Sequence, residues 1–123
     1  MIFVGNDIVE VSRIGHSMEN PLFLKRFFTE QEQEYFRRRK FAPEVVAGNF
    51  SVKEAFSKSL GTGISGFALK DVEVLRDEQG APYLNFYGNA LKIVLQRKLL
   101  FTVSISHTKN YASAVVIAFT EQS

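Results

Sequence analysis

Three residues of this chain carry charges that suit phosphate chemistry: Asp7, Glu54 and Lys58. Asp7 lies where an apolar, β-branched segment is expected to end as a strand, and an ionised carboxylate there needs a cation, hydrogen bonds or solvent. Glu54 and Lys58 have the i, i+4 spacing that brings two side chains onto one helix face. Two carboxylates with few other ligands suit Mg²⁺, which keeps water and takes oxygens from substrate phosphates. The spacing is equally compatible with a turn at Asp7 and a solvated ion pair between Glu54 and Lys58.

Other polar residues have the chemistry to hold phosphate groups near such a centre. Lys53 and Lys58 offer ammonium groups ahead of a glycine-rich segment. His107 and Ser106 end a predicted strand, where they would form part of a polar rim. A structural role for a lone histidine at a strand end is the alternative. A serine-hydrolase triad is not supported, because no G-x-S-x-G motif is present and the chain has only 2 His.

The strongest basic segment is the run Arg37–Lys40. It is typical of a solvated helix end that complements the helix dipole, and equally of a contact to phosphate or to an acidic partner. The whole chain is nearly balanced, with 15 Lys and Arg against 13 Asp and Glu. That balance argues against a non-specific nucleic-acid binder, and no aromatic RNA-binding pattern is present. If the charged residues above form a phosphate-chemistry site, we therefore expect no nucleic-acid partner.

Composition limits the class of protein further. With 123 residues, 46% of them hydrophobic and 23% charged, the chain is expected to form a single globular domain over residues 1–123. The absence of cysteine excludes disulfides and thiolate catalysis. No apolar run has the length of a membrane span, and the N-terminus does not resemble a signal peptide. We expect a cytoplasmic protein with no membrane partner.

Hydrophobic periodicity predicts an α+β fold in which helices pack on a mainly antiparallel sheet. A first strand should end near Asp7 or shortly after, followed by a helix capped by Ser12 that Asn20-Pro21 interrupts. Thr29 and Glu32 have capping-box spacing. The remaining expected elements are a helix over 30–39, a helix from Pro43 to a stop at Gly61-Thr62-Gly63, a hairpin over 71–76 and 83–86, a helix over 90–99, and strands over 101–106 and 111–119.

The helix that begins at Pro43 has two distinct faces. One face should enter the core, and it carries Val45, Val52, Phe56, Ser59 and Leu60. The opposite face carries Phe50, Glu54, Lys58 and Gly61. The predicted acid and its cation therefore lie near the C-terminal end of this helix.

Five segments, in this order, resemble one known family. They are GNDIVEVSRI, FLKRFFTEQE, FSVKEAFSKSLGTG, DVEVLRDEQGAPYL and SISHTKNYASAVVI. The most specific are the Asp after the N-terminal strand, the KEA-F-x-K-x-L-G-T-G helix and the S-I-S-H-T strand end. Across nearly its whole length the chain resembles the holo-[acyl-carrier-protein] synthase group of 4′-phosphopantetheinyl transferases. That resemblance implies the 4′-phosphopantetheinyl transferase fold.

The resemblance implies a reaction and its residues. The 4′-phosphopantetheine arm of coenzyme A would move to a serine of apo acyl carrier protein, releasing adenosine 3′,5′-bisphosphate. Asp7 and Glu54 would hold Mg²⁺ with the coenzyme A pyrophosphate, and a carboxylate would take the proton of the serine. Lys58 would stabilise the phosphate under attack or the leaving group. With the phosphate contacts expected above, the predicted coenzyme A site comprises Lys40, Lys53, Ser57, Lys58, Gly61, Ser106 and His107.

The resemblance also implies partners. Acyl carrier proteins are acidic, so Arg13 and Arg26 would dock one, and Met18 would add an apolar contact. Bacterial members of the group form trimers with active sites at subunit interfaces, so a homotrimer is expected.

The chain departs from the family pattern at three places. Asn6 precedes Asp7 where the family often has Ile, Val or Thr. Asn49 replaces a residue that is often basic, so one phosphate contact would have to come from Lys40 or the arginine run. Ser51-Val52 replaces a smaller pair, which is expected to affect packing rather than chemistry.

Two alternatives to the transferase come from other classes. A binding module would use the basic run to recognise an acidic protein or RNA without catalysis. A Mg²⁺-dependent phosphohydrolase acting on nucleotides would release inorganic phosphate. Metal-dependent binding of coenzyme A distinguishes the transferase from the binding module.

Overall fold

The structure is a computed structural model that describes residues 1–61 and 66–121. A three-stranded antiparallel sheet has the order β1-β5-β4, and a separate antiparallel hairpin pairs β2 with β3. The strands are β1 (Ile2–Glu10), β2 (Val72–Arg76), β3 (Pro82–Phe86), β4 (Leu99–His107) and β5 (Tyr111–Thr120). The helices are α1 (Val11–Ser17), α2 (Leu22–Phe27), α3 (Glu30–Arg38), α4 (Pro43–Ser59), the 3₁₀ turn η1 (Leu69–Asp71) and α5 (Gly88–Arg97).

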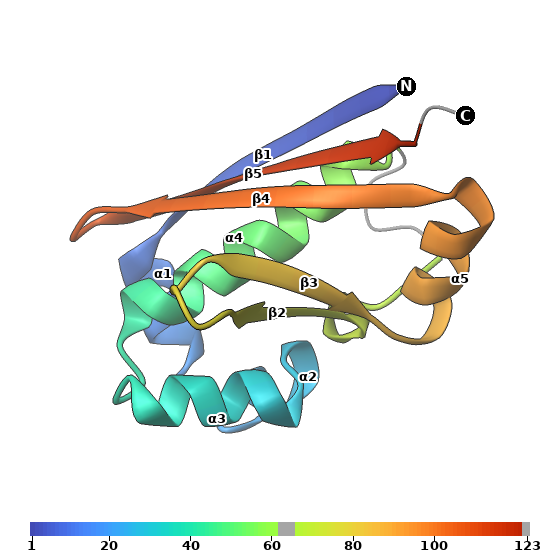
Figure 1. Ribbon diagram of the computed structural model, residues 1–123. Coiled ribbons are helices and arrows are strands. Elements are labelled where there is room, and N and C mark those ends of the chain that lie inside the picture. Colours follow the sequence, from blue (N-terminus) through green and yellow to red (C-terminus); the bar gives the residue numbers. More distant parts are fainter. Residues whose placement is uncertain (62–65, 122–123) are drawn as a thin grey trace.

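Helix α4 organises the molecule. It lies under the three-stranded sheet, with the β2–β3 hairpin and then α3 further from the sheet (Figure 1). It packs directly on β1 and β5 and reaches both β4 and β2. The fold is therefore α+β with antiparallel pairing, as the sequence predicts.

Both sides of α4 are buried in aromatic clusters, which accounts for many of the 12 Phe in the chain. On the sheet side, Phe56 lies 5.3 Å from Phe101 and 5.4 Å from Phe67 between ring centroids. On the side of α3, Phe28 and Phe36 meet edge to face at 5.0 Å. The face predicted to enter the core is buried throughout, at Val45, Val52, Phe56, Ser59 and Leu60.

Several predicted elements are confirmed. The Thr29–Glu32 capping box begins α3, with both reciprocal hydrogen bonds present. The turn between β2 and β3 closes through the Gly80 N–H, which donates to the Asp77 carbonyl at 2.9 Å. Gly61 follows α4 with a φ of +80°, and Thr62 and Gly63 of the predicted stop lie outside the described residues.

The first strand ends shortly after Asp7, as predicted, since β5 pairs with β1 as far as Glu10 opposite Tyr111. One detail of the predicted N-terminal half is wrong. The helix α1 consequently begins at Val11, and Ser12 lies inside it rather than capping it.

A further short helix, α2, was also not predicted. It follows Pro21 directly, because a proline interrupts one helix but suits the start of the next. No helix within residues 1–61 and 66–121 is long and apolar enough to cross a membrane.

Candidate active site

Asp7 lies in the middle of β1, opposite Ala114 of β5, on the face of the sheet that α4 covers. Its side chain is 13% exposed, and its Oδ1 accepts a hydrogen bond from Nζ of Lys58 at 3.1 Å. Lys58 itself is half-exposed on the last turn of α4. The structure thus brings together two residues that are 51 positions apart in the chain.

Glu54 completes this group from the preceding turn of α4. Burial raises the pKa of Glu54, and the neighbouring charge of Asp7 raises it further, while Lys58 and Arg13 oppose both effects. Two carboxylates whose charges repel each other are a site where a cation gains by binding. Asp7, Glu54 and Lys58, singled out in the sequence, therefore share one site in the structure.

The donors present fit Mg²⁺ better than a metal that needs a full protein cage. Within residues 1–61 and 66–121, no cluster of three or more His, Cys, Asp or Glu could hold a metal ion. Mg²⁺ commonly takes one or two carboxylates and fills its other positions with water and phosphate oxygens. Asp7 and Glu54 would hold such an ion, and the half-exposed Lys58 leaves room for a charged substrate.

Two residues that position the acid pair were missed as functional in the sequence. A Cβ at Gly5 would lie 1.9 Å from the carbonyl oxygen of Ala55, so β1 and α4 touch backbone to backbone. Ser51, expected to affect packing only, donates from Oγ to the backbone oxygen of Asp7 at 3.1 Å. A glycine two residues before the acid, facing a helix of small residues, is the signal that would have identified this contact.

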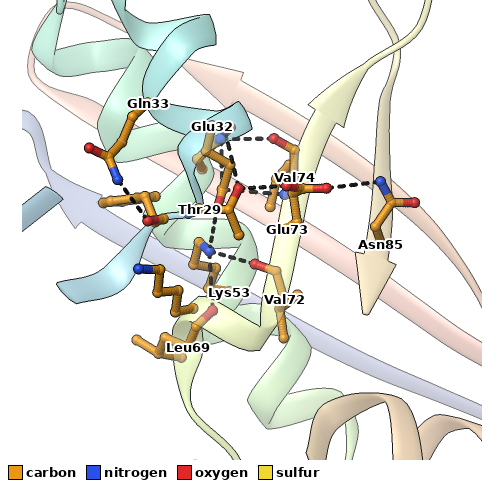
Figure 2. Close-up of polar contacts among 12 residues, drawn as sticks. Thr29, Glu32, Gln33, Lys53, Leu69, Val72, Glu73, Val74 and Asn85 are labelled. Carbon is orange, nitrogen blue, oxygen red and sulfur yellow. Dashed lines mark hydrogen bonds and ion pairs between the residues drawn. The ribbon is translucent and has the colours of Figure 1, made fainter. Parts of the chain in front are cut away.

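Lys53 does not belong to the site, which corrects the prediction that it holds phosphate. Its ammonium group is fully buried and forms an ion pair with Glu32 of α3 at 2.8 Å. It also donates to the carbonyl oxygens of Leu69 and Val72 (Figure 2). Burial raises the pKa of Glu32 and lowers the pKa of Lys53, and their mutual attraction opposes both shifts. Lys53 thus links α4 to α3, η1 and β2 inside the core.

The two other predicted α4 contacts to coenzyme A differ from one another. Ser57 is 1% exposed, and its hydroxyl donates to the Lys53 carbonyl one turn earlier, so it lines no open surface of this chain. Gly61 is exposed just after α4, and no atom of the described residues lies within 4 Å of where its Cβ would be.

Ser106, His107 and Lys40 lie away from the acid pair. Ser106 and His107 are exposed at the end of β4, and Lys40 is exposed after α3 with a φ of +57°. His107 lines a pocket of about 170 Å³ that excludes Asp7 and Glu54. Its lining comprises Tyr35, Arg39, Glu44, Val45, Gly48, Arg76, Gly80, Pro82, Ile105 and His107. We refer to it as the basic pocket, since it contains two arginines and a histidine.

The predicted carrier-protein residues lie on the first two helices. Arg13 is exposed on α1, close enough to the acid pair for its charge to lower the pKa of Glu54. Arg26 is exposed on α2, where its guanidinium lies 5.4 Å from the centre of the Phe27 ring. Met18 is half-buried against the second aromatic cluster.

Known proteins resemble this chain in both sequence and fold. Residues 3–116 match the model of the 4′-phosphopantetheinyl transferase superfamily. A holo-[acyl-carrier-protein] synthase of Clostridium botulinum is 48% identical over 115 residues, which cover 93% of this chain and 94% of the relative.

Solved structures of holo-[acyl-carrier-protein] synthases have a fold similar to that of this chain. A holo-(acyl-carrier-protein) synthase from Bacillus anthracis, in complex with CoA (3′,5′-ADP), has a TM-score of 0.81 and 33% identity, covering 97% of this chain and 96% of that one. A holo-[acyl-carrier-protein] synthase from Neisseria meningitidis has a TM-score of 0.89 and 26% identity, covering 98% and 100%. The chain therefore belongs to the holo-[acyl-carrier-protein] synthase group of the 4′-phosphopantetheinyl transferase superfamily.

Proposed function

We propose that this chain transfers 4′-phosphopantetheine from coenzyme A to a serine of apo acyl carrier protein in the cytoplasm, releasing adenosine 3′,5′-bisphosphate. The observation that carries the proposal is the joint placement of Asp7, Glu54 and Lys58 at one half-exposed site. The C. botulinum relative bears the name of this enzyme, and the B. anthracis structure contains CoA. Asp7 and Glu54 would hold Mg²⁺ there.

Each charged group has a task in this reaction. Bound Mg²⁺ would offset negative charge on the pyrophosphate as its bond breaks. A carboxylate of the pair Asp7 and Glu54 would take the proton of the attacking serine. Lys58, whose Nζ contacts Asp7, would turn toward the transferred phosphate and stabilise its charge.

The position of Arg13 supports a docking role for α1 beside the site. Its charge reaches Glu54, so a carrier protein bound at Arg13 would present its serine near the acid pair. Arg26 would extend this surface onto α2, with Met18 as the apolar contact. An acidic carrier is attracted to such a surface over a distance set by ionic strength.

Binding of coenzyme A would require contacts beyond the acid pair. The basic pocket with His107 lies at the N-terminal part of α4 and the end of β4, whereas Asp7 lies on β1 at the other edge of the sheet. Because the basic pocket and the acid pair lie at opposite ends of α4, we propose that the complete site joins the acid pair of one subunit to the basic pocket of its neighbour. Ser106, His107 and Lys40 would then contact the adenosine phosphates.

An apolar surface suited to such assembly is present on the outer face of the three-stranded sheet. Ile2, Val4 and Ile8 of β1 are 78%, 64% and 66% exposed, and Tyr111 and Val115 of β5 continue the patch. In Figure 1 the helices α1 to α4 lie on the other side of this sheet. Exposed apolar surface of this kind marks an interaction site, and the homotrimer expected from the resemblance would cover it.

The experiment that tests the proposed function uses the purified chain with apo acyl carrier protein, coenzyme A and Mg²⁺. Mass spectrometry of the carrier should show the gain of one phosphopantetheine, with adenosine 3′,5′-bisphosphate in solution. An unchanged carrier, or release of inorganic phosphate instead, would refute the transferase.

A further inference from the structure

Asn49, which replaces a residue that is often basic in the family, is fully committed to the protein interior. Its amide Nδ2 donates to Glu32 Oε2 at 3.1 Å and to the carbonyl oxygen of Val74 at 3.0 Å. Its Oδ1 accepts a hydrogen bond from Nη2 of Arg76 at 2.9 Å. These contacts use both donor hydrogens of the amide and leave Asn49, which is 0% exposed, no access to a ligand.

Arg76 is the last residue of β2, and one of the two terminal nitrogens of its guanidinium has a hydrogen-bond partner among the described residues. Its guanidinium lies 4.9 Å from the centre of the Tyr35 ring and donates through Nη2 to Asn49. Its other terminal nitrogen, Nη1, is buried yet has no hydrogen-bond partner within the part of the chain that the structure describes. A buried donor without a partner is unfavourable, and native proteins retain few of them. An exogenous acceptor would satisfy Nη1.

The surroundings of Arg76 favour an anionic acceptor. Arg76 lines the basic pocket with Arg39 and His107, and Glu44 is the one acidic residue among the lining. Burial lowers the pKa of Arg76, Tyr35 and Glu32 oppose this shift, and the charge of Arg39 adds to it. A bound anion would offset both effects, and a guanidinium suits phosphate oxygens in particular.

We propose that Arg76 binds a phosphate group of coenzyme A through Nη1. The guanidinium reaches the pocket from β2 instead of α4, and Asn49 holds it there through Nη2. This assignment rests on the proposed function, and Arg76 would act there alongside the contacts proposed for Ser106, His107 and Lys40.

Calorimetric titration of coenzyme A into the wild type and Arg76→Gln, both with Mg²⁺, tests the assignment. Loss of a charged hydrogen bond should weaken binding by about 10- to 100-fold. Lys92→Gln removes an exposed cation on α5 and serves as the matched control with unchanged affinity. Equal affinities of Arg76→Gln and wild type would overturn the assignment while leaving the proposed function intact, whereas a wild type that binds no coenzyme A would refute both.

Dephospho-coenzyme A identifies which phosphate Arg76 binds. If Arg76→Gln weakens coenzyme A alone, the residue binds the ribose phosphate. If it weakens both ligands equally, the residue binds the pyrophosphate. If it weakens neither, the assignment is wrong.

Relocation of the guanidinium provides a second test that does not depend on one variant. Arg76→Asn should lose affinity as Arg76→Gln does, and Asn49→Arg in the same chain should restore at least about ten-fold of it. Thermal melting accompanies each titration, so that binding is compared between folded proteins only. A folded double variant with no better affinity than Arg76→Asn would contradict the assignment.

Discussion

Gly5 on β1 and Ala55 on α4 meet through their backbones, with space for no side-chain atom between them. A Cβ added at Gly5 would lie 1.9 Å from the oxygen of Ala55 and 2.6 Å from the nitrogen of Ser59. This contact sets the distance between the strand that carries Asp7 and the helix that carries Glu54. The geometry of the acid pair thus depends on a residue with no functional group.

Gly5→Ala should displace α4 from β1, because neither backbone can move aside as a flexible side chain would. We expect a loss of about 3 kcal/mol in the free energy of unfolding. We also expect transfer activity to fall by a larger fraction than the amount of folded protein does. Gly15→Ala is the matched control, since its nearest neighbours are Pro43 side-chain atoms at 3.7 Å. Similar melting temperatures for the two variants would contradict this account of the contact.

Glu54→Gln should stabilise the metal-free protein at neutral pH while abolishing transfer. The folded chain raises the pKa of Glu54 above its ordinary value of 4.5, so the folded state holds this proton more tightly than the unfolded chain does. The stability that Glu54 contributes is therefore present at low pH and is lost as pH rises through the raised pKa. Melting temperatures measured without divalent cations should favour Glu54→Gln at neutral pH and converge with wild type in acid. A lower melting temperature at neutral pH would refute the proposed repulsion.

Lys53→Met should destabilise the protein by about 3–5 kcal/mol, because it leaves Glu32 buried without its cation. Adding Glu32→Gln should recover part of that loss, since the remaining amide carries no charge. Denaturant titration measures both variants. If Lys53 were instead a phosphate ligand, Lys53→Met would raise the KM for coenzyme A in the folded protein and leave stability unchanged.

Val4→Asp should dissociate the proposed homotrimer, because it places a charge in the exposed apolar patch of β1. Light scattering after gel filtration should report a smaller particle, and transfer activity should fall as the two halves of the site separate. Leu22→Asp changes an equally exposed residue, at 64%, on α2 and should leave the mass unchanged. A wild type that is itself monomeric at assay concentrations would contradict the shared site.

Elements with strong local signals were predictable from the sequence. The capping box at Thr29 and the alternation of β4 depend on neighbouring residues, and both are confirmed. The end of β1 was predictable only approximately, because its exact length is fixed by pairing with β5 more than a hundred positions later. The short helix α2 likewise has too few residues for a periodic pattern.

The residues of the site likewise divide into those that local sequence identified and those whose role required tertiary structure. Residue types and a family resemblance were enough to bring Asp7, Glu54 and Lys58 to attention. The exclusion of Lys53 required tertiary structure, because an ammonium group in the core is indistinguishable in sequence from one on the surface. The Nη1 of Arg76, which has no partner among the described residues, and the close approach at Gly5 are properties of three-dimensional contacts. Neither can be read from composition.

Asp7 and Glu54 together should support metal-dependent transfer to the carrier protein. The most direct measurement is the mass of apo acyl carrier protein after incubation with coenzyme A and wild type, Asp7→Asn or Glu54→Gln, each with and without Mg²⁺. We expect a phosphopantetheine gain only with wild type in the presence of Mg²⁺, while both variants remain folded by circular dichroism. Full modification of the carrier by either variant, or by wild type after removal of the metal, would contradict this expectation.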